Sequence, residues 1–466
     1  MIGACAQGLL TLALMAAGPA ATKHILFAFV DHFEPYGALA SRQVGAWVND
    51  YMAMAGRHAD ADGRHPVHSY FLISPPAIES SLLETTLVRL NEVTYRGYGE
   101  IEYHCHHGVP DERLRTEQEA TEELVRLVTD AKARFTSHGA LVTAEAQPRG
   151  TFGFIHGNWA LDNSRHDPWY QGDGHYEYCG VDRELEILSR LGAYADFTFP
   201  AWGPMEPYLK NAIFYAADDD RPASYENLEQ THLVEVGQPS WGDLMLIEGP
   251  AVDYCWGPDA TDNIGCVAGS YHDWPTLRRM GYCVVCNIHV IGNDDWIFVK
   301  VHTHGCAGDI ADPQTWDCFF GGSMDRFYSQ IEGEYNDGTV WKLHYVSARE
   351  MYNIVKAAEA GMTGDPSLYR DYLIRPPANS VILTASHYRL ISDDAGGITL
   401  EVTGNPEQVD MRFRQCSVYH SLFLESPELE GPWEAADAEE FPGEFGEMHV
   451  IDSTPSRFYR VIPTGR

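Results

Sequence analysis

The residues with the clearest chemical potential in this sequence are three histidines in IEYHCHHGVPDE, residues 101–112. His104, His106 and His107 follow a segment in which polar and apolar residues alternate. Residues i and i+2 of a strand point to the same side, so His104 and His106 can share one centre, and His107 can join them if the chain turns at Gly108. Neutral imidazole is the commonest protein ligand for zinc and similar ions. The stretch therefore predicts a metal or substrate site, with a solvated polar loop as the alternative.

A carboxylate that could complete this site is Asp31, in FVDHFEP, residues 29–35. Asp31 ends an apolar run, where a carboxylate must be hydrogen-bonded or functional. One carboxylate with two imidazoles leaves metal positions open for water and substrate, which suits catalysis. His32 and Glu34 are alternatives at the same rim, and we assign them to substrate binding. A turn-capping or helix-capping role for Asp31 is the competing interpretation.

A second histidine pair lies in FVKVHTHG, residues 298–305, in which Lys300, His302 and His304 share one strand face. If this strand lines a barrel mouth, His304 can act as general acid or as a further metal ligand. We therefore predict His302 and His304 as catalytic residues. The alternative is an edge strand whose polar side faces water.

The segment FIHGNWALDNSR, residues 154–165, combines imidazole, amide, indole, carboxylate and guanidinium groups. Such a mixture suits recognition of hydroxyl-rich ligands such as sugars, whereas a capped helix start is the alternative. The predicted substrate-binding residues here are His156, Asn158, Trp159, Asp162 and Arg165. No nucleophile elbow, Walker loop or Rossmann glycine motif occurs in a suitable context, which argues against serine hydrolases, NTPases and dehydrogenases.

These groups follow segments that alternate between strand and helix patterns. The predicted strands are 24–33, 68–73, 100–107, 151–157, 194–200 and 296–305. The predicted helices are one beginning at a Thr116/Glu119 capping box, one over 184–192, and one over 347–361 with a Ser347/Glu350 capping box. This order predicts an α/β fold with parallel strands, and we favour a distorted β/α barrel over a doubly wound sheet. Ligands bind at the carboxyl ends of the strands in such folds.

The pattern changes after Pro376-Pro377, where short strands follow one another without a helix signal. We therefore predict two domains, a β/α barrel over 23–375 and an accessory β-sandwich over 380–466.

The chain has 466 residues and a formal net charge of −35, which is spread along the sequence. This acidity argues against nucleic acid and anionic membrane surfaces as partners. No stretch is long and apolar enough to predict a membrane span.

Residues 1–22 contain an apolar run followed by small residues, which resembles a secretory signal, although no Lys or Arg precedes the run. We therefore expect a secreted or periplasmic protein, with a cytoplasmic one as the alternative. Six of the ten cysteines lie between Cys255 and Cys318. Disulfides are the expectation for an exported chain, and free buried thiols or a zinc knuckle at YCVVC, in a run read as β-rich, are the alternatives.

Several strings together resemble a bacterial family of polysaccharide-deacetylase-like proteins of the glycoside hydrolase/deacetylase barrel superfamily, over roughly 23–375. They are FAFVDHFEPY, GEIEYHCHHGVPDE, FGFIHGNWALDNSR, GVDRELEILSRLGAYADFTFP, WIFVKVHTHG and LHYVSAREMYNIVKAAEAG. The resemblance implies a distorted β/α barrel and a divalent metal, with zinc expected. Asp31 and His104 match the family's metal positions best, and His304 falls at its late-strand catalytic histidine. The chain departs from the pattern in having one aspartate in place of two on the first strand, and His106 and His107 in place of a histidine four residues after His104.

The leading hypothesis is a metal-dependent hydrolase that removes acetyl groups from a polysaccharide. Asp31, His32 or His106 would accept a proton, and His304 would protonate the departing group. One alternative is a glycoside hydrolase that uses two carboxylates drawn from Asp31, Glu34, Asp162 and Asp196. The other alternative is a glycan-binding protein without catalytic activity.

Overall fold

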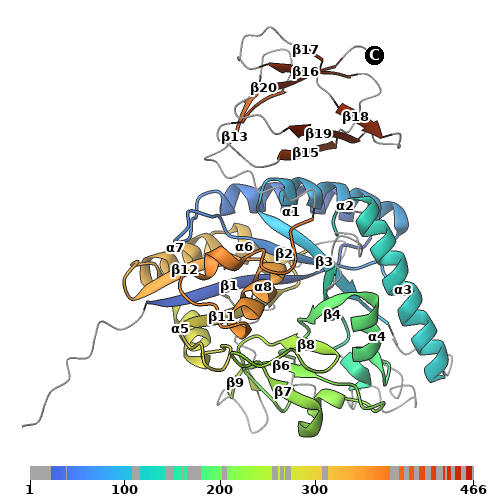
Figure 1. Cartoon of the computed structure of the whole chain (residues 1–466), viewed down its shortest axis with the longest axis vertical. Helices are drawn as coiled ribbons and strands as arrows, with labels where there is room; N and C mark the ends of the chain where they lie inside the picture. Colours follow the sequence, from blue (N-terminus) through green and yellow to red (C-terminus); the bar gives the residue numbers. More distant parts are fainter. Residues whose placement is uncertain are drawn as a thin grey trace, which may run out of the picture.

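A curled ten-stranded sheet with helices on both faces forms the centre of the protein (Figure 1). The structure is a computed structural model. It describes residues 22–377 apart from 38, 108–115, 142–150, 160, 165–179, 202–206, 254–260, 263–266, 268–273 and 307–312, and after residue 387 the backbone of a set of strands. The prediction of a mixed α/β architecture is confirmed.

Strand β1 (Lys23–Phe33) lies second from one end of the sheet and pairs with three other strands. It pairs in parallel with β11 (Trp296–Thr303) on one side. On the other side β12 (Trp341–Val346) pairs with its first half and β2 (His68–Leu72) with its second half, again in parallel.

The order along the sheet is β11-β1-β2-β3-β4-β5-β8-β6-β7, with β12 beside β1. The remaining strands are β3 (Gly99–Cys105), β4 (Phe152–His156), β5 (Ala193–Asp196), β6 (Ile213–Ala216), β7 (Thr231–Leu233) and β8 (Leu244–Ile247). Strand β6 runs antiparallel to β7 and β8, whereas β1 to β5 are parallel. A separate short pair joins β9 (Val252–Asp253) to β10 (Thr261–Asp262). All six strands predicted from the sequence are present.

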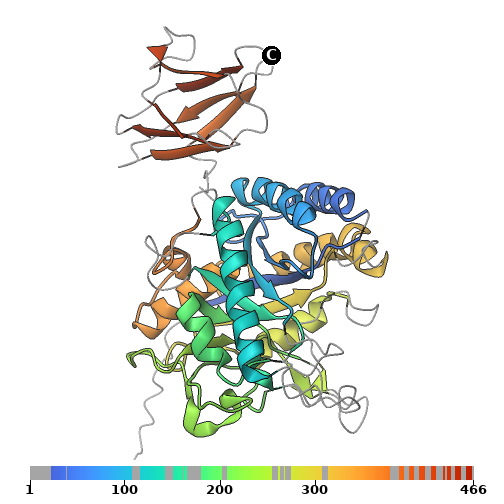
Figure 2. The same ribbon diagram turned by 90° about the vertical axis from the view of Figure 1, so that its right-hand side faces the viewer.

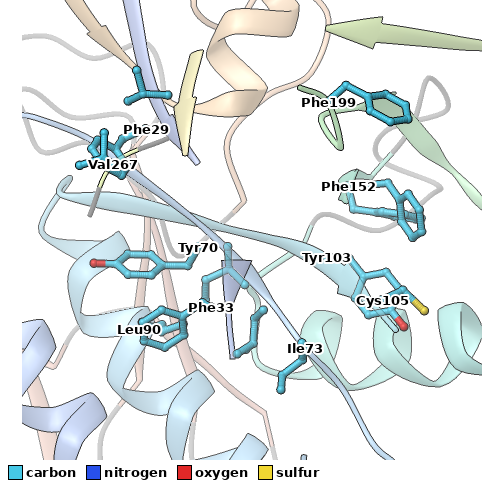
Figure 3. Packing of buried hydrophobic residues seen from close by; sticks show 14 of the residues in the cluster. Phe29, Phe33, Tyr70, Ile73, Leu90, Tyr103, Cys105, Phe152, Phe199 and Val267 are labelled. Atoms are coloured by element: carbon cyan, nitrogen blue, oxygen red, sulfur yellow. The ribbon is translucent and has the colours of Figure 1, made fainter. Parts of the chain in front are cut away.

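The sheet is buried on both faces, and alternate residues of its strands belong to two different cores. On β1, Phe27, Phe29 and Phe33 point to what we call the outer face, where they belong to the larger apolar cluster, part of which is drawn in Figure 3. Ala28 and Val30 point to the inner face and belong to the second cluster. This alternation follows from the period-2 geometry of a strand and decides which polar residues can meet.

Seven helices contribute apolar side chains to the outer cluster or lie beside it (Figures 1 and 2). They are α1 (Ala40–Ala55), α2 (Ser80–Tyr95), α3 (Glu117–Ser137), α4 (Glu184–Leu191), α5 (Leu277–Cys286), α6 (Pro313–Phe320) and α7 (Ser323–Tyr335). Helix α3 begins with the predicted Thr116/Glu119 capping box. Helix α4 ends at Gly192, whose left-handed backbone (φ 99°) is a conformation that glycine adopts readily. Short 3-10 segments are Leu161–Asn163, Ser224–Glu226, Leu228–Gln230 and Pro366–Tyr369.

Helix α8 (Ala348–Glu359) packs against the inner face of the sheet, and all twelve of its residues are buried. The predicted Ser347/Glu350 capping box is present at its start. A helix buried on every side must satisfy its polar side chains internally. Arg349 does so by donating to both carboxylate oxygens of Glu100 on β3, to Asp371 and to two backbone carbonyls.

The C-terminal part forms only strands where the structure describes it, in two antiparallel sheets. The first has the order β13-β14-β20-β16-β17 and the second β15-β19-β18. The strands are β13 (Tyr388–Ser392), β14 (Ile398–Val402), β15 (Val409–Arg414), β16 (Ser421–Ser426), β17 (Glu434–Ala435), β18 (Ala438–Phe441), β19 (Glu447–Asp452) and β20 (Phe458–Pro463).

The described cysteines differ from the disulfide expectation. Cys283, Cys286, Cys306 and Cys318 are free thiols, as is Cys105, and Cys255 and Cys266 lie outside the described residues. The YCVVC motif belongs to helix α5, which corrects the prediction of a β-rich run. Among the described helices, none combines the length and apolarity that a membrane crossing requires.

Breaking the Arg349–Glu100 pair should be costly, because its two side chains are only 3% and 7% exposed. Removing one partner of a buried pair leaves the other charge uncompensated, so we expect Arg349→Ala to lower the free energy of unfolding by about 3–5 kcal/mol. Arg190→Ala is the matched control, because that side chain is 72% exposed and should change stability by less than about 0.5 kcal/mol. Denaturant titration measures both, and equal effects of the two substitutions would contradict the prediction.

A pair of histidines on the neighbouring strands β1 and β12 should make stability depend on pH. His344 donates from Nδ1 to Asp62 (2.9 Å), which leaves its Nε2 to accept from His24 Nδ1 (2.8 Å). Burial, and then the neighbouring His344, lower the pKa of His24 to about 4. The unfolded chain therefore binds the extra proton first, so this contribution to stability is complete above about pH 6.5 and is lost as the pH falls toward 4.

His24→Gln tests this dependence, because an amide can still donate to His344 but does not titrate. We expect the free energy of unfolding of this variant to fall less steeply than that of the unmodified protein between pH 7 and pH 4.5. Denaturant titrations across this range measure the difference, and parallel profiles would show that His24 titrates normally.

Candidate metal centre

Five polar side chains meet at the carboxyl ends of β1, β3 and β11. His32 and Glu34 come from the end of β1 and the residues after it, His104 and His106 from the end of β3, and His304 follows β11. We call these five residues the strand-end cluster. The carboxyl ends of parallel strands are where α/β folds bind ligands, because the connecting loops leave side chains there free to converge.

Glu34 is the carboxylate around which the imidazoles gather. Its Oε1 lies 3.4 Å from His106 Nε2 and 3.6 Å from His104 Nδ1. The ring centroids of His32 and His304 are 4.6 Å apart, and those of His32 and His104 are 4.9 Å apart. Ligand atoms of Glu34, His104 and His106 all lie within 4.8 Å of one another, as do those of His32, Glu34 and His304. Either group could hold a metal ion.

The electrostatics of Glu34, His104 and His32 favour the protonation states that metal ligands need. At His106 burial opposes the charge, but the hydrogen bond with Glu34 and the negative charge of that carboxylate outweigh burial and raise the pKa. Burial opposes the charge on Glu34, but the hydrogen bond with His106 and the nearby His104 outweigh it and lower the pKa of Glu34 to about 2. Burial lowers the pKa of His104 to about 3, and burial with the neighbouring His304 lowers the pKa of His32 well below 6.5. Glu34 is therefore ionised and these two imidazoles are neutral at ordinary pH.

Unsatisfied buried nitrogens are a further sign that the cluster suits a cation. Neither ring nitrogen of His104 makes a hydrogen bond of normal geometry within the described residues, and the same holds for Nδ1 of His32. Such groups are costly when buried without a partner. A divalent ion would supply that partner, and two imidazoles with one carboxylate are a donor set that zinc accepts.

Asn158 fixes the orientation of His106. The Asn158 amide nitrogen donates to the His107 carbonyl (3.0 Å), so its oxygen accepts from Nδ1 of His106 (2.9 Å). Nε2 of His106 faces Glu34, to which it donates when protonated, and it becomes a potential ligand atom when it loses that proton. A ligating histidine is commonly oriented in this way through its second nitrogen. Asn158, predicted as a substrate residue, thus supports the cluster.

Asp31 lies on the opposite side of β1 from the strand-end cluster, although the sequence analysis placed it with His104. Its carboxylate accepts from His68 Nε2 and from the Gly305 backbone N–H, both at 2.7 Å, and is fully buried. A Cβ at Gly305 would lie 2.3 Å from Asp31 Oδ2, so only glycine permits this contact. Asp31 therefore anchors the chain directly after His304, and Glu34 takes the carboxylate position among the histidines.

His107 also points away from His104 and His106, to the outer face. There its Nε2 hydrogen-bonds Glu184 Oε1 at 2.7 Å, and its ring lies 4.4 Å from that of His156. All three residues are buried. His107 and His156 thus form a group separate from the strand-end cluster, and Glu184 was not identified from the sequence.

The other predicted residues lie at varied distances from the cluster. His302 is buried on the inner face with its ring 5.9 Å from that of His32, and Trp159 lies 6.5 Å from His304 between ring centroids. Asp162 is buried and accepts from the Ser224 backbone N–H, away from the cluster. Arg165 lies outside the described residues.

Comparison with known proteins assigns no family to the chain. No protein-family model matches it, and no curated protein matches its sequence at a significant level. The resemblance to polysaccharide-deacetylase-like proteins therefore stays an expectation, and the function must be argued from the site.

Gly157 should be essential to the cluster. A Cβ there would lie 2.4 Å from Nε2 of both His104 and His106, far inside contact distance. We expect Gly157→Ala to displace both imidazoles and weaken zinc binding by about 10–100-fold, the range seen when ligand orientation is disturbed. Gly333→Ala in helix α7 is the matched control, because a Cβ there meets nothing within 4 Å. Zinc titration calorimetry compares the two, and unchanged affinity in Gly157→Ala would contradict the assignment.

Proposed function

We propose that the protein is a metal-dependent hydrolase that removes acetyl groups from a polysaccharide, with zinc as the metal. One observation carries the proposal: Glu34, His104 and His106 converge at the carboxyl ends of parallel strands, beside the imidazoles of His32 and His304. A set of one carboxylate and two imidazoles leaves coordination positions for water and substrate, as catalytic rather than structural zinc sites do.

The chemistry follows from the donor set. A bound divalent ion supplies polarisation of an acyl oxygen and a water of lowered pKa. Glu34, His104 and His106 would hold it, and Asn158 would keep His106 oriented. In a centre with one ion, His32 and His304 would move protons to and from the substrate. Trp159, beside His304, offers an apolar surface of the kind on which sugar rings pack.

The proposal extends to the architecture and location expected from the sequence. The curled sheet would belong to a distorted β/α barrel, residues 380–466 would form a β-sandwich, and the protein would be exported after removal of residues 1–22. Oligosaccharide or polysaccharide would be its partner.

A glycoside hydrolase has less support among the described residues. Its mechanism needs two carboxylates facing the substrate from about 5–10 Å apart. Of the four candidates, Asp31 is bound to His68 and Gly305, Asp162 to Ser224, and Asp196 to Thr198. Glu34 is the candidate that stands within the strand-end cluster.

Metal analysis combined with acetate release tests the proposal. We expect the purified protein to bind zinc and to release acetate from an N- or O-acetylated oligosaccharide. His104→Ala should bind less zinc and lose at least about 100-fold in turnover, because His104 is one of the proposed ligands and neither of its ring nitrogens makes a normal hydrogen bond among the described residues. His289→Ala is the control, because His289 hydrogen-bonds only the nearby Asn287 carbonyl and belongs to no candidate metal group of the described residues.

The other outcomes identify the alternatives. A protein that binds no metal even after zinc is added would exclude this mechanism. Freed reducing ends without acetate would indicate a glycoside hydrolase, and oligosaccharide binding without turnover would indicate a glycan-binding protein.

A further inference from the structure

The strand-end cluster contains more metal donors than one catalytic ion uses. A catalytic zinc ion usually takes three protein ligands and keeps its remaining position for water or substrate. The cluster offers four imidazoles and one carboxylate, and three of its members, His104, Glu34 and His106, already make such a set. The two further imidazoles, of His32 and His304, therefore need an explanation of their own.

The five donors divide into two sets that share Glu34. His104 and His106 form one pair, with ring centroids 4.8 Å apart, and His32 and His304 form the other, 4.6 Å apart. Each pair brings a ligand atom to within 4.8 Å of a Glu34 oxygen. A carboxylate has two oxygens and can therefore serve two ions at once.

We propose that the strand-end cluster holds two divalent ions bridged by Glu34, one bound by His104 and His106 and the other by His32 and His304. The inference rests on the proposed hydrolase function and changes one part of it, since His32 and His304 become ligands. Paired ions of this kind, about 3.5–4 Å apart, activate water and stabilise the oxygen that gains charge during hydrolysis.

The surroundings of the second pair support ligation. His32 is 2% exposed, and its Nδ1 has no hydrogen-bond partner among the described residues. Its nearest aromatic neighbours in the cluster are imidazoles, His104 at 4.9 Å and His304 at 4.6 Å. The single carboxylate Glu34 cannot satisfy four imidazoles by hydrogen bonds alone, whereas two cations would use the lone pair of each.

Buried hydrogen bonds also hold the backbone next to His304 in place, as a metal ligand requires. The backbone N–H of the following residue, Gly305, donates to Asp31, and Asp31 is held in turn by His68. Both bonds are buried, so the chain leaving β11 is fixed next to His304. A ligand held by its own backbone loses little conformational freedom when it binds an ion.

The test uses the full-length protein, stripped with a chelator and reloaded with Mn²⁺ or Zn²⁺. Elemental analysis of the reloaded wild-type protein should give about two ions per chain. Electron paramagnetic resonance of the Mn²⁺ form should show an exchange-coupled pair rather than isolated ions. His304→Ala should retain about one ion per chain and lose the coupled signal, and His289→Ala should retain both.

The possible failures are distinct. Saturation of the wild-type protein and of His304→Ala at one ion each, with the spectrum of isolated Mn²⁺, would overturn the two-ion centre and leave the one-ion hydrolase intact. Failure of the wild-type protein to bind either metal would overturn both proposals. If His304→Ala does not fold, the stoichiometry and spectrum of the wild-type protein decide the question by themselves.

Discussion

The alternation of side chains along strands buried on both faces is the constraint on which the rest of this structure depends. Because β1 and β3 lie inside the sheet, each residue must point either to the outer helices or to the inner core. His104 and His106 therefore share a side, and Asp31 and His107 are excluded from it. A shift of one residue in either strand would exchange these sets, so the register of the sheet defines the candidate site.

The polar groups on the outer face of the sheet hold parts of the chain that carry the strand-end cluster. Asp31, bound to His68 and Gly305, secures the chain after His304, while His107 and His156 pack beside Glu184. Asn158 connects the two sides, since it hydrogen-bonds the His106 ring and the His107 carbonyl. Asn158 thus orients the His106 ring, and Asp31 holds the backbone next to His304, which suits a site that must hold these ligands in place before an ion arrives.

A fully buried helix covers part of the inner face of the sheet. Helix α8 lies there with every residue buried, and its charged side chains are matched within the core, above all Arg349 with Glu100. Such buried pairs contribute little net stability but are costly to break, so they act as constraints on the position of the helix. The strand-end cluster is different, because within the described part of the chain both ring nitrogens of His104 and Nδ1 of His32 lack the hydrogen-bond partners that Arg349 has. This contrast is the physical basis for assigning the cluster, rather than the core network, to ligand binding.

The sequence by itself determined the local features of this protein. The strands, the two capping boxes and the shared face of His104 and His106 follow from patterns within a few residues of each other. The same alternation, applied to Phe29, Asp31 and Phe33, would have separated Asp31 from His32 and Glu34. Only the tertiary structure decided which side chains of different strands meet, because it pairs β11 with β1 and packs α8 against the inner face of the sheet. Glu184 and His68, distant in sequence from their partners, could be found only in this way, since packing rather than local pattern creates their contacts.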